Sequence, residues 1–219
     1  MIDGTDGAFL ARDENGLFLG FEEQKIRGDF SRMARRLKQA NLERELLIKA
    51  SRLKGHTGPF MALDATAGLG EDSLLLAAAG FHVRMYEKDP VIAALLEDAM
   101  NRAKELPELS EAVSRMELFK EDSISAMKNT DPSPDIILLD PMFPQRQKSA
   151  LVGKKFQLIH ILEKPCEDEN DLLDAAVSAH PRKIIIKRPL KGSFLGGRKP
   201  DYSISGKAIR YDCIVLPPI

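Results

Sequence analysis

From residue 59 onward, short apolar runs alternate with stretches of helical periodicity, and this alternation limits the fold more than any other feature. The expected strands cover residues 59–63, 81–86, 116–119, 135–139 and 183–187, with one or two more in 208–216. The expected helices cover residues 73–79, 90–106 and 171–179, with a short one after residue 119. Strand–helix units of this length favour a mostly parallel, twisted sheet with helices on both faces. The predicted fold class is therefore α/β and Rossmann-like.

The first 43 residues have a different pattern. Two apolar runs within residues 8–21 flank the turn signal Asn15-Gly16, which predicts a small β-hairpin. Apolar residues at helical spacing predict a helix over residues 44–53, ending before Gly55. We therefore divide the chain into an N-terminal appendage, residues 1–43, with the hairpin and a basic segment, and a main domain, residues 44–219.

Length and composition set broad limits on the class of protein. A chain of 219 residues, 43% of them hydrophobic, can bury a full core. No apolar stretch approaches the roughly 18 to 20 residues that cross a bilayer, and the polar opening lacks a signal peptide. We expect a cytoplasmic protein that does not enter membranes. The two cysteines and four histidines lack metal-ligand spacing, so reduced thiols and no metal are expected.

Charge is distributed unevenly along the chain. Residues 25–54 hold ten Lys or Arg against three acidic residues, and residues 182–210 hold nine against one. Residues 87–135 between them hold twelve acidic and six basic residues. Two basic segments around an acidic middle favour a nucleic-acid binder that contacts phosphates. The alternative is that both segments are ordinary solvated helix faces.

Residues 64–73 indicate a nucleoside-binding loop. Gly68 and Gly70 follow the first core strand and precede a helix, where backbone can approach a ligand closely. The nicotinamide fingerprint fails because Ser73 replaces its third glycine, and the carboxylates of Glu71 and Asp72 would repel a phosphate. Acidic groups instead suit a cofactor with a cationic amino-acid part, such as S-adenosylmethionine. A tight turn without a ligand is the alternative.

Polar residues also follow the next two strands. Glu87 lies at the end of the second core strand, where an acid can accept both ribose hydroxyls. Its other interpretation is a surface acid that pairs with Lys88. Asp122 and Ser123 follow the third strand, where a polar side chain can meet an adenine amino group. Together with Asp64 and its loop, these residues place polar groups at three successive strand ends.

The segment Asp140-Pro-Met-Phe-Pro144 is the most specific element of the sequence. An exocyclic amine is a poor nucleophile because its lone pair is delocalised, so a methylating site must hold the nitrogen in line with the methyl donor. Its two N–H groups could bond the Asp140 carboxylate and a backbone carbonyl near Pro141, while Phe143 stacks on the base. This pattern predicts amine methylation. The alternative is an Asp that caps a turn beside a buried Phe.

At this point the chain resembles a bacterial family, the ribosomal RNA small subunit methyltransferase J family, which methylates a guanine N2 in small-subunit RNA. The matching stretches are residues 64–70, 83–87, 90–96, 140–144, 147–152 and 187–189. The resemblance implies the class I methyltransferase fold, S-adenosylmethionine as cofactor, and ribosomal RNA or the small ribosomal subunit as partner. The family's cofactor contacts would fall on Glu71, Asp72, Glu87, Lys88, Asp122, Ser123 and Asp140.

Three stretches depart from the family pattern. Glu71 stands where the family has a basic residue, Asp122-Ser123 replaces a pair of serines, and the arginine-containing segment 35–45 lacks the family's glycines. The basic residues expected to contact RNA phosphates, or else to be plain solvated side chains, are Arg35, Arg36, Arg146, Lys148, Lys187 and Arg188. The Gly-, Lys- and Arg-rich stretch 192–202 is either a loop that RNA orders or a disordered connection.

These observations favour methyl transfer from S-adenosylmethionine to guanine N2 in small-subunit (16S) ribosomal RNA, with Asp140, Pro141 and Phe143 as the catalytic group. Adenine N6 or a glutamine amide would suit the same clamp. A protein of another class, an RNA-binding ribosome-assembly factor that uses the nucleoside only structurally, also remains open. A nicotinamide-dependent oxidoreductase comes last because of Ser73 and the acidic loop.

Overall fold

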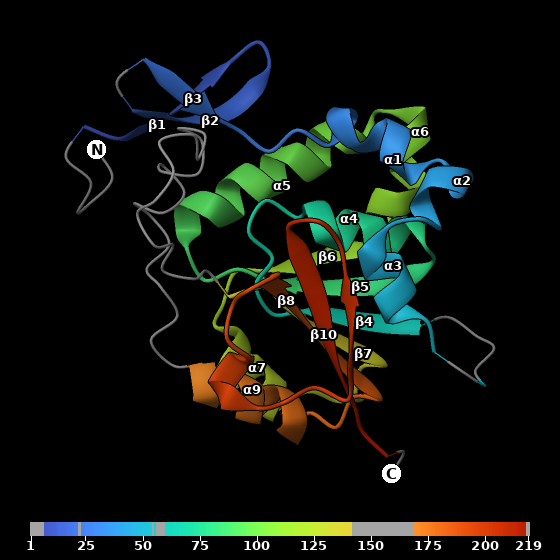
Figure 1. The fold of residues 1–219 in the computed structure, drawn as a ribbon. Helices are drawn as coiled ribbons and strands as arrows, with labels where there is room; N and C mark the ends of the chain where they lie inside the picture. Colours follow the sequence, from blue (N-terminus) through green and yellow to red (C-terminus); the bar gives the residue numbers. More distant parts are fainter. Residues whose placement is uncertain (1–6, 22, 54, 56–59, 142–168, 218–219) are drawn as a thin grey trace.

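The computed structural model describes residues 7–21, 23–53, 55, 60–141 and 169–217. They form a seven-stranded sheet of order β6-β5-β4-β7-β8-β10-β9 and a separate three-stranded sheet, β1-β2-β3 (Figure 1). Pairing is parallel from β6 to β8 and antiparallel among β8, β10 and β9. The expected α/β fold, with a mostly parallel sheet and a small N-terminal β appendage, is confirmed.

The strands of the small sheet are β1 (Phe9–Asp13), β2 (Gly16–Phe21) and β3 (Gln24–Ile26). Those of the large sheet are β4 (Phe60–Asp64), β5 (Phe81–Tyr86), β6 (Met116–Phe119), β7 (Ile136–Leu139), β8 (Lys183–Pro189), β9 (Tyr202–Ser205) and β10 (Ile209–Val215). The helices are η1 (Phe30–Met33), α1 (Ala34–Leu37), α2 (Gln39–Leu42), α3 (Leu46–Ser51), α4 (Glu71–Ala78), α5 (Pro90–Lys104), α6 (Pro107–Val113), α7 (Ser123–Lys128), α9 (Glu169–Ser178) and η2 (Leu195–Gly197).

Strand β7 shows why the central strands read as continuous apolar runs. Ile136 and Leu138 belong to the core cluster that also contains residues of α3, α4, α5 and α6, whereas Ile137 and Leu139 belong to the cluster with α7 and α9. All four side chains are at most 1% exposed. Helices therefore cover both faces of the sheet, and a central parallel strand has no solvent face that would call for polar residues.

The sequence analysis missed the strands β3 and β9, the helix α6 and the short helices η1, α1, α2 and η2. The short strands β3 and β9 lie at sheet edges, and β9 is mostly exposed, so neither has an apolar alternation that would reveal it. The stretch 192–202, expected to be a loop that RNA orders or a disordered connection, leads into β9, which pairs with β10 as an edge strand. Within the described residues, no helix is both long enough and apolar enough to cross a bilayer.

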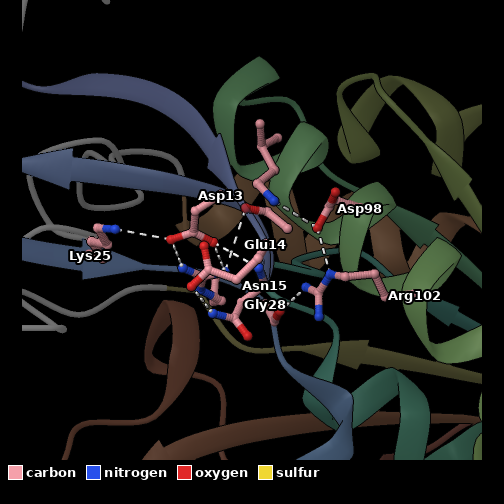
Figure 2. A network of polar contacts seen from close by, with 10 residues as sticks. Asp13, Glu14, Asn15, Lys25, Gly28, Asp98 and Arg102 are labelled. Atoms are coloured by element: carbon pink, nitrogen blue, oxygen red, sulfur yellow. Dashed lines mark hydrogen bonds and ion pairs between the residues drawn. The ribbon is translucent and has the colours of Figure 1, made fainter.

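The small sheet is fastened to α5 by the carboxylate of Asp98, whose side chain is 5% exposed (Figure 2). Its Oδ2 accepts hydrogen bonds from the Leu17 backbone N–H at 3.0 Å and from Arg102 Nε at 2.8 Å. Arg12 contacts its Oδ1 at 2.8 Å, and Arg102 also donates to the carbonyl of Gly28. One buried acid on the main domain thus holds both β2 and the chain segment that leaves β3.

The segment between the two sheets packs on the main domain. Phe30, Met33 and Leu42 are buried in the same core cluster as residues of β4 and β5. The basic segment that the sequence analysis grouped with the appendage is therefore joined to the main core by these side chains. The division at residue 43 remains a prediction.

Replacing Asp98 with Ala should lower the free energy of unfolding by roughly 1 to 3 kcal/mol, because it leaves the partly buried Arg102 guanidinium and the Leu17 N–H without this acceptor. Arg12→Ala removes the 64%-exposed partner of the same carboxylate and should cost only about 0 to 1 kcal/mol. Urea denaturation of both variants measures the difference. Equal losses would mean that Asp98 does not anchor the appendage.

Candidate active site

The glycine loop, residues 64–70, crosses the carboxyl ends of two strands. The Ala65 N–H donates to the Leu138 carbonyl at 3.0 Å, and the Ala67 N–H donates to the Tyr86 carbonyl at 3.1 Å. Gly68 and Gly70 have φ of 53° and 76°, a region that residues with a side chain rarely adopt. A Cβ on Gly70 would lie 2.6 Å from Leu96 Cδ1, so packing as well as backbone conformation requires glycine there.

Asp64 determines the shape of this loop from beneath. Its side chain is buried and accepts hydrogen bonds from the Thr66 N–H at 3.1 Å and the Ser73 hydroxyl at 2.6 Å. Ser73, which breaks the nicotinamide fingerprint, therefore ties α4 to the end of β4. Burial raises the pKa of Asp64 to about 7 although both hydrogen bonds lower it. That Asp64 takes part in cofactor binding remains a prediction. With these contacts it would act indirectly, by holding the glycine loop in the shape that binds the cofactor.

Glu87 lies against the glycine loop, as the sequence analysis expected. Its Oε2 accepts the Gly68 N–H at 3.0 Å and its Oε1 accepts the Asp89 N–H at 2.8 Å, while the residue is 8% exposed. Burial raises its pKa, and the two backbone donors oppose that shift. The carboxylate is thus fixed by the backbone rather than by Lys88, which is exposed. Each oxygen keeps a lone pair with which it can accept a further hydrogen bond.

Asp140, at the end of β7, contacts the glycine loop directly. Its backbone N–H donates to the Thr66 hydroxyl at 2.7 Å. Its carboxylate Oδ2 lies 2.9 Å from Lys187 Nζ, and the same ammonium lies 2.8 Å from Asp72 Oδ2 on the first turn of α4. Asp72, Lys187 and Asp140 therefore form one cluster, which we call the acid–lysine cluster. The glycine loop and the start of the predicted amine clamp share one location.

The charges of this cluster depend on one another. Burial lowers the pKa of Lys187, but Asp72 and Asp140 outweigh that effect and the net shift is upward. Burial raises the pKa of Asp140, and Lys187 opposes it. Burial, and then the charge of Asp72, raises the pKa of the buried Tyr211 phenol. Two carboxylates and one ammonium leave a net negative charge, which favours a cationic ligand.

The outlying cofactor candidates lie at the same edge of the sheet. Asp122 caps the N-terminus of α7 by accepting the Ser125 N–H at 2.9 Å, and Ser123 is 8% exposed. Glu71 is exposed on the first turn of α4. Because the carboxyl ends of parallel strands meet at one edge, residues after β4, β5, β6 and β7 surround a common region. Contact of Glu71, Lys88, Asp122 and Ser123 with a cofactor remains a prediction.

The basic residues proposed to contact RNA fall into different environments. Arg36 forms a two-point ion pair with Glu45, at 2.7 and 2.9 Å. Together with the exposed Arg35 it helps to line a cavity of about 340 Å³, whose other lining residues are Asn41, Arg44 and Glu45. The predicted residues Phe143, Arg146 and Lys148 lie outside the described residues.

Arg188 requires a correction. It is 2% exposed, and its Nε donates to the Ser193 carbonyl at 2.7 Å, so its guanidinium supports backbone and is not available at the surface for an RNA phosphate. Lys187 was also predicted to contact an RNA phosphate. Its ammonium instead forms ion pairs with the two carboxylates of the acid–lysine cluster. Its position suits the orientation of Asp140 better than contact with a phosphate.

Sequence reasoning missed two participants, Thr66 and Tyr211. Both were hidden because their contacts come from distant parts of the chain: the Thr66–Asp140 bond joins residues 74 apart. A sequence signal did exist for the role of Lys187, since a lysine that directly follows the apolar run Ile184–Ile186 needs a hydrogen-bond acceptor for its charge.

The described residues fit S-adenosylmethionine. Backbone without Cβ atoms at Gly68 and Gly70 lies beside the spare lone pairs of Glu87, which suits a ribose. The net negative acid–lysine cluster lies on the other side of the loop, where it suits sulfonium and ammonium charges. When bound, this cofactor supplies an electrophilic methyl group.

Asp64→Asn gives a pH-dependent test of the buried loop acid. A pKa raised from 3.8 to about 7 gives stability that is complete below pH 3.8 and is lost as the pH rises to about 7. Asparagine does not titrate, so the stability of the variant relative to the parent should increase between about pH 4 and about pH 7. Denaturant midpoints across this range measure it. A difference that stays constant with pH would contradict the shift.

Comparison with known proteins agrees with this geometry. Residues 5–216 match a family described as "Putative SAM-dependent methyltransferase". Two relatives named ribosomal RNA small subunit methyltransferase J are similar: that of Nitrosococcus oceani is 42% identical over 82% of this chain and 71% of the relative, and that of Thioalkalivibrio sulfidiphilus is 38% identical over 94% and 84%. A SAM-dependent methyltransferase structure from Neisseria gonorrhoeae has a TM-score of 0.76 at 31% identity, covering 95% of this chain and 83% of that one. The chain therefore belongs to the family of SAM-dependent methyltransferases.

Proposed function

We propose that this protein transfers a methyl group from S-adenosylmethionine to guanine N2 in small-subunit ribosomal RNA. One observation carries the proposal: the Thr66 hydroxyl and Lys187 join the glycine loop and α4 to Asp140, so a nucleoside cofactor and a target amine would meet at one place. The names of the 38% and 42% identical relatives support small-subunit ribosomal RNA as the substrate. The resemblance of the clamp segment supports guanine N2 as the acceptor.

Asp140 is the residue that would orient the amine. Its Oδ2 faces Lys187, and no donor among the described residues contacts its Oδ1, so Oδ1 can accept one amine N–H. The Pro141 carbonyl would accept the second N–H, which fixes the plane of the amino group. The charge-assisted bond to the Asp140 carboxylate would contribute about 1.5 to 3 kcal/mol.

Lys187 and Asp72 would control the charge of Asp140. An amine N–H bonds a carboxylate better than a protonated carboxyl, and the Lys187 ammonium opposes the upward shift that burial gives the pKa of Asp140. Asp72 in turn holds Lys187 in place at 2.8 Å. Phe143 would stack on the target base, and a base within a helix would have to leave its stack to reach this site.

Asp140→Ala should reduce kcat/KM for methyl transfer by about 10- to 150-fold, because it removes the acceptor that orients the amine. S-adenosylmethionine should still bind, since Glu87 and the glycine loop remain. Methyl incorporation into small-subunit RNA from cells that lack this gene, with calorimetry for the cofactor, measures both effects. Glu105→Ala, at the exposed C-terminal end of α5, is the matched control. Unchanged transfer by Asp140→Ala would rule out the clamp.

The acid limb of the pH–rate profile tests the acid–lysine cluster separately. Transfer should fall as the pH drops through the pKa of Asp140, since only the ionised carboxylate accepts the amine well. Lys187→Met removes the cation that lowers this pKa, so the limb should move to higher pH. Asp72→Asn removes an anion that raises it, so the limb should move to lower pH. Shifts in the same direction, or none, would contradict the coupling.

A further inference from the structure

A loop of residues 190–199, called here the 190–199 loop, is held from beneath by two buried arginines. Arg210, which is 6% exposed, donates to the carbonyls of Pro189, Leu190 and Gly192 at 2.9, 2.8 and 3.0 Å. Arg188 donates to the Ser193 carbonyl at 2.7 Å. Four backbone carbonyls on the surface thus receive their hydrogen bonds from guanidinium groups that reach them from inside the protein.

The second half of the loop is also fixed. Leu195 is 1% exposed and belongs to the core cluster that contains residues of α9. The Gly196 N–H faces Glu169 Oε2 at 3.3 Å, and Gly196 and Gly197 turn the chain with φ of 53° and 68°. The stretch 192–202, for which mobility or disorder was expected, therefore has a defined conformation that begins with these contacts.

The outer face of the loop combines positive charge with an aromatic ring. Its ten residues include Lys191, Arg198 and Lys199 and no acidic residue, and all three side chains are exposed. Within the part of the chain that the structure describes, none of the three forms an ion pair with a carboxylate. Phe194 is 37% exposed, with the Arg210 guanidinium 5.2 Å from its ring centre. Surfaces that bind single-stranded nucleic acid combine these two features: bases stack on the aromatic ring, and the surrounding cations contact the phosphates.

The loop starts close to the candidate active site. Leu190 follows Lys187 by three residues on the same extended chain, which corresponds to roughly 10 Å between their Cα atoms at about 3.3 Å per residue. Burying two arginines has a large desolvation cost, which ion pairs of Arg210 with Asp212 and of Arg188 with Glu169 partly offset. Their remaining N–H groups fix the backbone at the start of this loop. A binding surface that is ordered before its ligand arrives loses less entropy on binding.

We propose that the 190–199 loop is a preordered docking surface for the single-stranded RNA that flanks the target base. Phe194 stacks on an unpaired base, and Lys191, Arg198 and Lys199 contact the phosphates on either side of it. This inference rests on the proposed function, because it takes the RNA substrate from there. It adds the surface that positions the RNA next to Asp140.

The charge contacts are tested by Arg198→Ala/Lys199→Ala. Binding to small-subunit RNA should weaken, and the slope of log affinity against log salt should become shallower by about 1.4, or about 0.7 for each lost phosphate contact. Lys104→Ala/Lys128→Ala is the matched control: both lysines are exposed in the last turns of α5 and α7, outside the 190–199 loop. The control should leave the slope unchanged.

The aromatic contact is tested by Phe194→Ala, which should weaken RNA binding by about 5- to 150-fold without changing the salt slope. Val215→Ala is its control, an exposed apolar residue paired with Lys183 at the far end of β8. Calorimetry with S-adenosylmethionine, which should give parental affinity for every variant, verifies that each is folded.

The outcomes separate the two proposals. Parental RNA binding and methyl transfer by both loop variants would overturn the docking surface and leave the proposed function intact. A parent protein that neither binds nor methylates the RNA would overturn both. Variants that bind protein-free RNA normally but lose affinity for whole small subunits would show that the loop contacts a ribosomal protein, and this too would overturn the RNA surface.

Discussion

The ammonium of Lys187 lies between two carboxylates that belong to different elements, and the arrangement of the candidate site depends on it. Asp72 comes from the first turn of α4 and Asp140 from the end of β7, each within 3 Å of Nζ. Without the cation, two neighbouring carboxylates in a partly buried place would repel, and one would take up a proton. With it, the site keeps a net negative charge and Asp140 keeps an oxygen for a substrate.

The other polar side chains at this edge of the sheet hold the protein backbone in place, and they can still accept further hydrogen bonds from a ligand. Asp64 binds the Ser73 hydroxyl, Glu87 binds the N–H groups of Gly68 and Asp89, and Thr66 accepts the Asp140 N–H. Each bond fixes a side chain that would otherwise rotate, and a carboxylate oxygen still has lone pairs left. The edge is therefore rigid before any ligand binds, which lowers the entropy lost on binding.

The basic residues near the C-terminus show that the number of cations in a segment does not equal the number exposed on the surface. Nine cations between residues 182 and 210 suggested one phosphate-binding patch. Lys183, however, donates to the Ala50 and Arg52 carbonyls, and Arg188 and Arg210 hold the 190–199 loop from inside. Exposed cations remain on the loop itself, among them Arg198 and Lys199. Buried cations thus order the backbone that presents the exposed ones.

The sequence by itself determined most of the secondary structure, the α/β class and the glycine loop, because these follow from local rules. Burial on both faces gives β7 its continuous apolar run, and Gly70 has no room for a Cβ. It did not reveal β3 and β9, since short edge strands lack an apolar pattern.

The sequence also singled out Asp72, Asp140 and Lys187, but it assigned Lys187 to RNA. Only the tertiary structure decided that they form one cluster, because Asp72 and Lys187 lie 115 residues apart in the sequence. The charge of a residue does not identify its ion-pair partner, and the two meet only once the sheet has formed.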